Sequence, residues 1–192
     1  MVKCGTKTAA ILVALAVSLL WIAAAHGRSP QQIPKEPIKW SLKATLPDKP
    51  LKAGDRFSLQ LTATIEPGWH LYSTDQAEGG PTPTRIAIPS GQPFEQDGAV
   101  ESSAPKEAMD PNFNLMTQYY EEQALFVVPV KIATKAPAGK TEVKVNVSYQ
   151  TCNEELCLPP RTVKLSAPVN ISKPPRPQDA KPSEVETWRL GG

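Results

Sequence analysis

The stretch that decides the fold is Phe57-Ser-Leu-Gln-Leu-Thr-Ala-Thr-Ile65, where apolar and polar residues alternate without a break. The five odd-numbered residues are apolar and the four even-numbered ones are polar. Because successive side chains of a strand point to opposite faces, this pattern predicts a β-strand with one buried face. The same alternation runs through Val143–Tyr149, which predicts a second long strand.

Shorter versions of this pattern lie along the rest of the chain, separated by turn residues such as Pro67-Gly68 and Pro137-Ala-Gly139. They are Trp40–Ala44, Arg85–Ile88, Leu125–Ile132 and Thr162–Leu165. About seven short strands with frequent turns predict an all-β fold, an immunoglobulin-like antiparallel β-sandwich. Pro129 interrupts one pattern and predicts an edge position or a bulge there.

Composition excludes the main alternatives to a β fold. The chain has 192 residues, of which 40% are hydrophobic and 21% charged, so one globular domain is expected. Its 21 prolines are spread over residues 30–182 and leave little room for long helices. An all-α protein and a doubly wound α/β fold are therefore excluded, because both need such helices.

The ends of the chain differ in composition from its centre. Lys3 and Lys7 precede an uncharged run over residues 9–25 that ends in three alanines, which predicts a signal peptide over 1–25. An uncleaved N-terminal anchor is the alternative. Residues 26–37 are predicted to form an extended arm, residues 38–172 the β-sandwich domain, and residues 173–192 a Pro-rich tail or linker.

Removal of residues 1–25 would take away two of the 21 basic residues, none of the 19 acidic ones, and Cys4. The remaining chain would carry no net charge and no basic cluster, so nucleic acid is not expected as a partner. Two cysteines would remain, Cys152 and Cys157. In an oxidising, exported compartment such a pair is expected to form a disulfide.

The spacing of these cysteines leaves three functions open. A ring of about six residues stabilises a fold by roughly 2 kcal/mol, against about 4.7 for a 100-residue loop, so this bridge would be a weak staple. A small ring is also more readily reduced, which favours redox chemistry. Metal binding is the third option, with His70, Met109 or Met116 completing the ligand set. We predict no metal or other cofactor, because these side chains do not follow metal-ligand spacing.

The segment around the two cysteines resembles a known protein family. Val147-Ser-Tyr-Gln-Thr-Cys-Asn-Glu-Glu-Leu-Cys-Leu-Pro-Pro160 resembles the active-site hairpin of the N-terminal periplasmic domain of the DsbD thiol:disulfide interchange proteins. Gly68-Trp-His-Leu-Tyr72 looks like the aromatic strand of that family, and Tyr120–Val130 looks like its strand with an apolar-Pro-Val ending. The resemblance extends over roughly residues 38–172.

This resemblance implies a function and its partners. Cys152 and Cys157 would be the catalytic, disulfide-forming pair, with Cys157 in the attacking position and Cys152 in the resolving one. Electrons would come from a membrane electron transporter or a thioredoxin-like protein and pass to periplasmic thiol oxidoreductases, as in cytochrome c biogenesis. The chain would then be an exported, periplasmic domain with protein-disulfide reductase activity. Glu154 and Glu155, inside the ring, would disfavour a thiolate there or would simply solvate the loop.

The family also has a cap loop whose aromatic residues shield the disulfide. The equivalent segment here is Asp110–Thr117, in which Phe113 and Met116 are the expected cap residues. His70 and Tyr72 are expected to line the site. The alternative for Phe113 and Met116 is that they anchor a long surface loop, and for His70 and Tyr72 that they are ordinary strand residues.

The chain departs from the family pattern in its cap segment, which lacks the usual Tyr-Gly, and in a cysteine spacing one residue shorter than in some members. Beyond the Pro-rich tail it shows neither a membrane transporter nor a thioredoxin domain. The competing function for the whole chain is a non-catalytic β-sandwich binding module, in which the Cys152–Cys157 disulfide only staples a hairpin.

Overall fold

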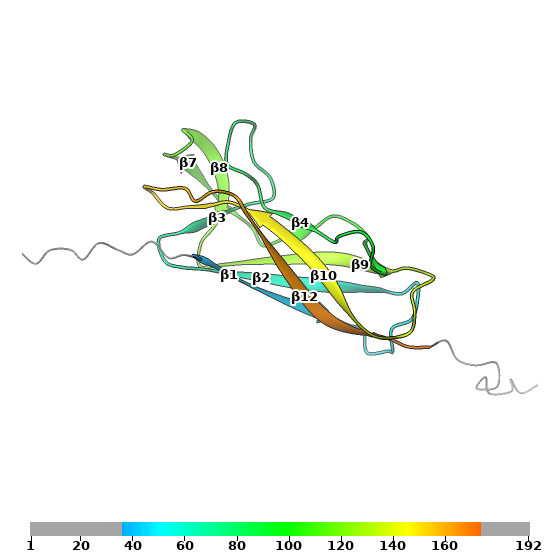
Figure 1. The fold of residues 1–192 in the computed structure, drawn as a ribbon. Helices are drawn as coiled ribbons and strands as arrows, with labels where there is room; N and C mark the ends of the chain where they lie inside the picture. Colours follow the sequence, from blue (N-terminus) through cyan, green and yellow to red (C-terminus); the bar gives the residue numbers. More distant parts are fainter. Residues whose placement is uncertain (1–35, 174–192) are drawn as a thin grey trace, which may run out of the picture. The chain divides into compact units, whose positions relative to one another are not determined.

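The computed structural model describes residues 36–173, and all regular elements within this range are β-strands (Figure 1). In chain order they are β1 (Ile38–Thr45), β2 (Arg56–Ile65), β3 (His70–Tyr72), β4 (Arg85–Ala87), β5 (Phe94–Gln96), β6 (Glu101–Ser102), β7 (Lys106–Asp110), β8 (Leu115–Tyr120), β9 (Gln123–Ile132), β10 (Gly139–Tyr149), β11 (Thr151–Cys152) and β12 (Arg161–Ile171). Between residues 36 and 173, no helix is long and apolar enough to span a bilayer. The predicted signal peptide, the arm up to residue 35 and the tail from residue 174 lie outside the described residues.

Two antiparallel sheets form the sandwich. One has the order β1-β2-β9-β5, with β6 also paired to β9, and the other has the order β12-β10-β4. The all-β, immunoglobulin-like antiparallel β-sandwich predicted from the sequence is therefore confirmed. The expected number of strands was too low, because the short strands β3, β5, β6, β7, β8 and β11 carry no extended alternation.

The core lies between these sheets and consists of the apolar faces that the alternation predicted. Leu59, Leu61 and Ala63 of β2 are fully buried in one cluster with Phe126 of β9. From the facing sheet, β10 contributes a run of fully buried side chains, Val143, Val145 and Val147, and almost fully buried Tyr149. Burial of apolar area at roughly 25 cal/mol per Å² makes this core the main source of stability.

Pro129 lies in β9, an interior strand of its sheet, so the edge position predicted for it is wrong. The irregularity lies instead in the segment that pairs with β9 on one side. This segment is divided into two short strands: β5 ends at Gln96, and β6 begins at Glu101. In the gap, the Asp97 amide donates to the Pro129 carbonyl at 2.9 Å. A strand residue directs its nitrogen and its carbonyl to the same side, so the missing proline N–H faces this gap and no ladder bond is lost.

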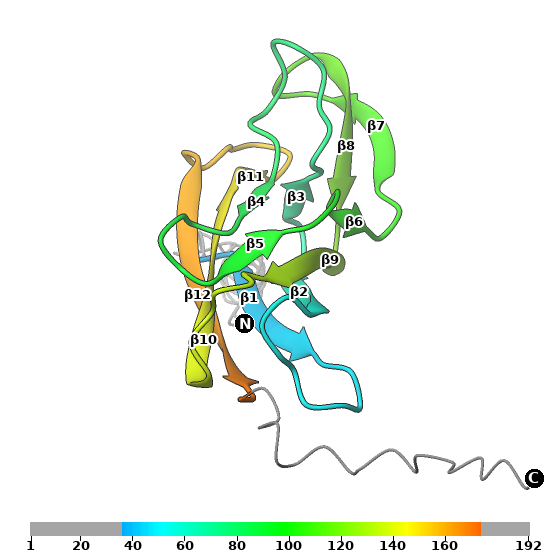
Figure 2. The same cartoon turned by 90° about the vertical axis from the view of Figure 1, so that its right-hand side faces the viewer.

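A third antiparallel sheet, with the order β11-β3-β8-β7, extends from one end of the sandwich. Each of its main strands continues from the sandwich. β3 follows β2 after a turn at Gly68, whose φ of 80° favours glycine. β8 leads into β9, and Gln150 alone separates β11 from β10. In Figures 1 and 2, β7, β8 and the loop after β11 lie at the same end of the molecule.

Residues 110–117, expected to be a cap loop or, in the alternative, a long surface loop, form the tip of a β-hairpin. β7 and β8 pair from Lys106–Tyr119 to Asp110–Leu115, and only residues 111–114 are outside the strands. Asn114 has a φ of 52°, a conformation that asparagine tolerates, and its amide donates to the Asp110 carbonyl at 2.8 Å. A hairpin holds its tip more firmly than a loop would.

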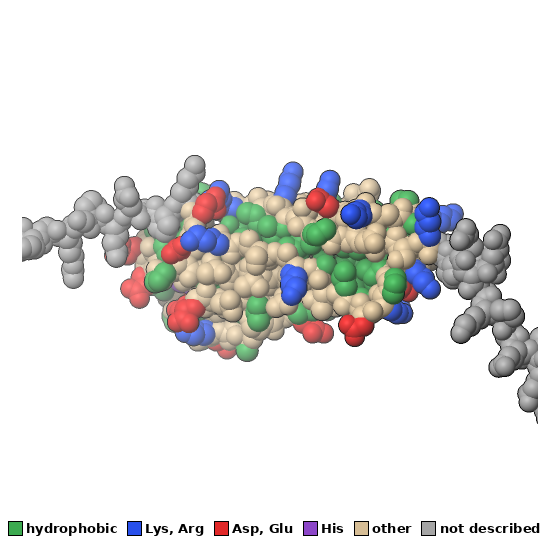
Figure 3. Space-filling view, turned by 90° about the horizontal axis from the view of Figure 1, so that it is seen from below, with side chains coloured by type: hydrophobic (Ala, Val, Ile, Leu, Met, Phe, Trp, Pro, Cys, Tyr) green, Lys and Arg blue, Asp and Glu red, His purple; other side chains and the backbone are tan. Residues whose placement is uncertain are grey.

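The two sheets of the sandwich leave a seam between their edge strands β1 and β12. Hydrophobic side chains along these edges are packed against the core but only partly buried: Trp40, Leu42, Ala44, Val163 and Leu165. Figure 3, seen from below, shows hydrophobic side chains at the surface on that side, interspersed with both acidic and basic ones. The exposed charges limit the contiguous apolar area there.

Truncation of Leu61 tests the core. Leu61 is fully buried and lies opposite Phe126 on β9. Leu61→Ala should lower the free energy of unfolding by about 2–5 kcal/mol, because it removes buried methyl groups and leaves a cavity. Urea denaturation followed by circular dichroism measures this change. Leu46→Ala, at a side chain that is 45% exposed, is the matched control and should change stability by less than about 1 kcal/mol.

Candidate redox site

Cys152 and Cys157 are joined by a disulfide that closes a short hairpin. The Asn153 side chain shapes its turn, because Asn153 Oδ1 accepts the backbone amides of Glu155 at 2.9 Å and Leu156 at 2.7 Å. The Leu158 amide donates to the Thr151 carbonyl at 3.0 Å and closes the stem. An asparagine that binds amides two and three residues ahead is a turn-forming device, so the hairpin is built by local sequence.

The disulfide is fixed to the fold through the pairing of β11 with β3. Leu71 lies opposite Thr151, and His70 opposite Cys152. Thr151 Oγ1 also donates to the His70 carbonyl at 2.7 Å. Cys152 is fully buried, whereas Cys157 is partly exposed. The two cysteines of the pair therefore differ in their exposure to solvent.

Gln150, between β10 and β11, ties the stem of this hairpin to a neighbouring loop. Its Oε1 accepts the Thr82 amide at 2.8 Å, and its Nε2 donates to the Leu158 carbonyl at 3.5 Å. The side chain therefore links the loop before β4 to the chain just after Cys157. Gln150 belongs to the Tyr-Gln-x-Cys motif, but only the structure gives it this role.

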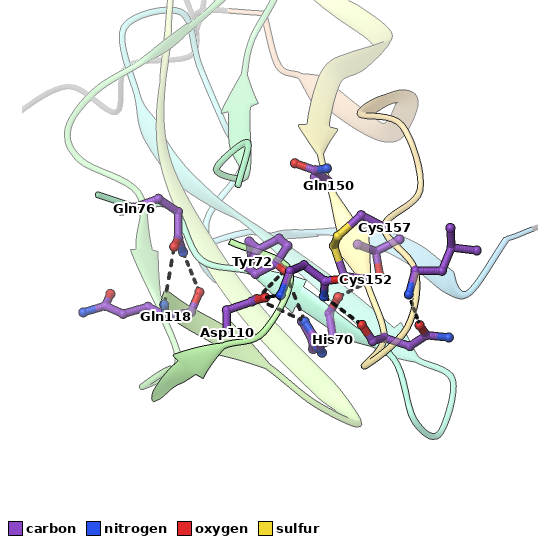
Figure 4. A network of polar contacts seen from close by, with 12 residues as sticks. His70, Tyr72, Gln76, Asp110, Gln118, Gln150, Cys152 and Cys157 are labelled. Atoms are coloured by element: carbon purple, nitrogen blue, oxygen red, sulfur yellow. Dashed lines mark hydrogen bonds and ion pairs between the residues drawn. A yellow bond between two sulfur atoms is a disulfide. The ribbon is translucent and has the colours of Figure 1, made fainter. Parts of the chain in front are cut away.

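A group of polar side chains lies beside the disulfide (Figure 4). The Tyr72 hydroxyl donates to Asp110 Oδ2 at 2.5 Å, and His70 Nε2 lies 3.3 Å from the Tyr72 hydroxyl and 3.7 Å from Asp110 Oδ2. Asp110 is only 4% exposed, and its Oδ1 accepts the Asn112 amide at 2.8 Å. A buried carboxylate is tolerated here because both of its oxygens have hydrogen-bond donors.

The environment shifts the pKa values of all three groups. Burial would raise the pKa of Asp110, but hydrogen bonds from Tyr72 and the Asn112 amide outweigh it and hold the pKa below its ordinary value. Burial lowers the pKa of His70, and the carboxylate of Asp110 opposes this only in part. Burial, together with the hydrogen bond to Asp110, raises the pKa of Tyr72 far above its usual range. At neutral pH the site therefore holds a carboxylate, a neutral imidazole and a neutral phenol.

The tip of the β7–β8 hairpin reaches toward this group and the cysteine loop. The Phe113 ring packs edge-on against the Tyr72 ring, with centroids 5.9 Å apart. Asn112 Nδ2 donates to the Asn153 carbonyl at 3.1 Å, which connects the hairpin tip to the cysteine loop. The structure thus brings five of the six expected site residues into one region: Cys152, Cys157, His70, Tyr72 and Phe113.

Met116, the sixth expected site residue, belongs to the other face of the hairpin. It lies opposite Met109 on β7, and both side chains are exposed, 50% for Met116 and 59% for Met109. Asp110, the neighbour of Met109, directs its side chain to Tyr72. Because adjacent residues of a strand face opposite sides, the two methionines point away from the face that carries the polar group.

Farther along β8, the Gln76 side chain takes the place of a neighbouring strand. Gln76 Nε2 donates to the Gln118 carbonyl at 2.5 Å, and the Gln118 amide donates to Gln76 Oε1 at 3.4 Å (Figure 4). The Ser73 amide also donates to the Gln118 carbonyl, at 2.9 Å, as the last bond of the ladder that β3 begins. Gln76 therefore ends this ladder with side-chain rather than backbone groups.

Three contributors had no assigned role from the sequence: Asp110, Asn112 and Asn153. Asp110-Pro-Asn-Phe-Asn114 contains the residue types of a tight turn, and this signal could have indicated the hairpin. The contacts of Asp110 to Tyr72 and of Asn112 to Asn153 join residues 38 and 41 positions apart, and no local pattern reports them. Within residues 36–173, no three His, Cys, Asp or Glu side chains are grouped as they would be to hold a metal ion.

Comparison with known families decides the relationship. The family model described as thiol:disulfide interchange protein DsbD, N-terminal, matches residues 43–168. The chain belongs to this family. As a DsbD N-terminal family member, it is a domain of the thiol–disulfide exchange type, and it carries a disulfide at the cysteine hairpin of the matched region.

Solved structures give more distant likenesses to this DsbD-family domain. The N-terminal periplasmic domain of ScsB from Proteus mirabilis is 15% identical, with a TM-score of 0.46 over 72% of this chain and 49% of that chain. The chain thus spans about half the length of the ScsB chain. The Salmonella SafD adhesin is 14% identical, with a TM-score of 0.32 over 72% of this chain and all of that chain. No curated protein matches the chain as a relative.

Substitution of Asp110 tests the polar group of this DsbD-family domain. Because its folded-state pKa is depressed, Asp110 contributes stability that is fully present above its ordinary pKa of 3.8 and is lost as pH falls through the lower folded value. Asp110→Asn should lower the free energy of unfolding by about 1.5–3 kcal/mol at pH 7, and by less at pH 2.5. Urea denaturation at both pH values measures this. Asp48→Asn, at an exposed loop residue, is the control, and an equal loss at both pH values for Asp110→Asn would contradict the assignment.

Proposed function

We propose that this chain is an exported thiol–disulfide exchange domain that carries electrons through Cys152 and Cys157. The observation that supports this most directly is the position of the disulfide within one short hairpin of the third sheet. A bridge made for stability would join the two sheets of the sandwich, as in antibody domains. The Cys152–Cys157 bridge does not connect the two sheets of the sandwich, and neither cysteine belongs to the core cluster between them.

The two cysteines have different access, which supports different roles for them. Cys157 is partly exposed, so its reduced sulfur can reach a partner's disulfide, whereas Cys152 is fully buried. In the proposed reaction the Cys157 thiolate attacks the partner's disulfide, forms a mixed disulfide and releases one partner thiolate. Cys152 then attacks Cys157, which restores the Cys152–Cys157 bond and releases the second partner thiolate. The domain is oxidised and the partner reduced by two electrons.

The β7–β8 hairpin tip is the proposed cap over this pair. Phe113 reaches the site through its ring contact with Tyr72, and the Asn112–Asn153 hydrogen bond fastens the tip to the cysteine loop. Both contacts are weak enough to open when a partner docks, since one exposed hydrogen bond contributes only about 0.5–1.5 kcal/mol. Closed, the cap would slow reaction with small reductants and oxidants.

Membership of the DsbD N-terminal family supports the electron donors, the electron acceptors and the compartment that we propose for this reaction. Electrons would arrive from a membrane transporter or a thioredoxin-like protein and leave to periplasmic thiol oxidoreductases, including those that serve cytochrome c biogenesis. Export would depend on the predicted signal peptide at residues 1–25.

The different roles of the cysteines lead to opposite outcomes for two serine variants. In a chain whose Cys4 is also replaced by serine, reduced Cys152→Ser offered oxidised glutathione should accumulate one glutathione per chain, because Cys157 can attack but nothing resolves the adduct. Reduced Cys157→Ser should accumulate far less, because Cys152 is buried. Mass spectrometry of acid-quenched samples measures both. A wild-type reduction potential below about −300 mV, typical of structural bridges, would instead identify the disulfide as a staple.

The cap is tested with a phosphine reductant too small to need docking. Phe113→Ala should be reduced several-fold faster than the wild-type domain, because the ring no longer covers the approach to the sulfurs. Met109→Ala removes an exposed side chain from the opposite face of the same hairpin and serves as the control. Equal reduction rates for Phe113→Ala and the wild type, with an unchanged circular dichroism spectrum, would remove Phe113 from this role.

A further inference from the structure

Resolution of the mixed disulfide poses a proton problem for Cys152. The attacking species in thiol–disulfide exchange is the thiolate, and burial in apolar surroundings raises the pKa of a thiol. Cys152 is fully buried on β11, an edge strand of the third sheet. Its thiol would therefore hold its proton at neutral pH unless a neighbouring group accepts it.

His70 is the side chain that the fold places next to Cys152. The two residues lie directly opposite each other in the antiparallel pair of β3 and β11. Such partners point to the same face of the sheet, with Cβ atoms about 4.5–5.5 Å apart. Figure 4 shows the two side by side, with the imidazole adjacent to the strand that carries the disulfide.

The hydrogen bonds of Tyr72 determine which ring nitrogen of His70 is basic. A tyrosine hydroxyl has one proton, and that of Tyr72 is donated to Asp110 Oδ2. At 3.3 Å from the same hydroxyl, His70 Nε2 must then be the donor, so the neutral ring carries its proton on Nε2. Nδ1 retains a free lone pair, and no hydrogen bond to it is found among the described residues. Nδ1 is bonded to Cγ, so it is the ring nitrogen nearer to the backbone of β3, the strand that pairs with β11.

The charges around His70 suit a proton acceptor. Burial keeps the ring neutral at rest by lowering its pKa, while Asp110 at 3.7 Å favours the imidazolium once it forms. Glu121 and Glu154 act in the same direction as Asp110 from a greater distance. From β8, the Tyr119 ring packs against the imidazole, with centroids 5.0 Å apart. A base oriented by a carboxylate is the arrangement that activates nucleophiles in many enzymes.

We propose that His70 Nδ1 accepts the thiol proton of Cys152 during resolution. This role rests on the exchange function proposed above. The Cys152 thiolate attacks the Cys157 sulfur, the Cys152–Cys157 bond forms, and the bond between Cys157 and the partner breaks. The partner leaves as a thiolate with both electrons of the broken bond, and the proton held by His70 returns to it or to solvent. Tyr72 and Asp110 act as positioning residues, since they set the tautomer.

The experiment follows the glutathione adduct at Cys157 of the reduced full chain, with Cys4 replaced by serine in every variant, after mixing with oxidised glutathione. In wild type the adduct should be short-lived, and its resolution should slow as pH falls through the pKa of His70. His70→Gln should resolve about 10²-fold more slowly at pH 7, the scale of general-base catalysis. It should recover toward the wild-type rate near pH 10, where the thiol ionises without help. An unchanged rate and pH profile in His70→Gln would overturn the role.

A matched pair separates a chemical role from a structural one. Cys152→Ser and Cys152→Ser/His70→Gln should form the adduct at equal rates, because His70 serves Cys152 and not Cys157. Slowing of adduct formation by His70→Gln in this background would make its role structural. If the reduced wild-type chain is not oxidised by glutathione and Cys152→Ser forms no adduct, the exchange function itself fails, which is a different result.

The tautomer gives a test that needs no substitution. Nitrogen-15 shifts of the His70 ring in the oxidised wild-type domain should show a protonated Nε2 and an unprotonated Nδ1 above pH 7. Assignment is simple, because the chain has two histidines, His26 and His70. A proton on Nδ1 would exclude this nitrogen as the acceptor, even if the His70→Gln variant did not fold.

Discussion

The site depends on one short piece of backbone pairing, the two residue pairs that join β3 to β11. This pairing puts Cys152 opposite His70 and makes β3 the common support of His70 and Tyr72. A shift of one residue in register would turn every side chain of β11 to the other face and separate the disulfide from the polar group. The Thr151 hydroxyl bond to the His70 carbonyl adds a side-chain constraint on the same register.

The molecule separates stability from chemistry. The sandwich buries long apolar faces of β2, β9 and β10, so most of its free energy comes from area outside the Cys152–Cys157 hairpin. The third sheet has shorter strands, polar side chains and a buried carboxylate, and it is held by continuity with β2, β9 and β10. The cysteine hairpin meets the core through Leu156 and Leu158, which are partly buried against it, while Cys152 itself belongs to the third sheet.

The sequence was sufficient where a structural property is repeated along the chain. Alternation over residues 57–65 and 143–149 predicted two of the three strands that contribute most to the core, and the Cys-x₄-Cys spacing with Pro159-Pro160 indicated the family. The β7–β8 hairpin was missed because Lys106–Asp110 has a single apolar residue larger than alanine, so no buried face is visible in it. The link from Tyr72 to Asp110 was out of reach for another reason. It forms only when β3 and the hairpin are brought together by β8.

The amide side chain of Gln76 has a consequence for encounters with other chains. An open strand edge invites a foreign strand to add to the sheet, the event that begins many aggregates. Where β3 ends, Gln76 occupies both backbone groups of Gln118 that such a strand would use. A molecule arriving at this end of the domain therefore meets side chains and turns and cannot extend the sheet at Gln118, so brief contact is favoured over permanent association.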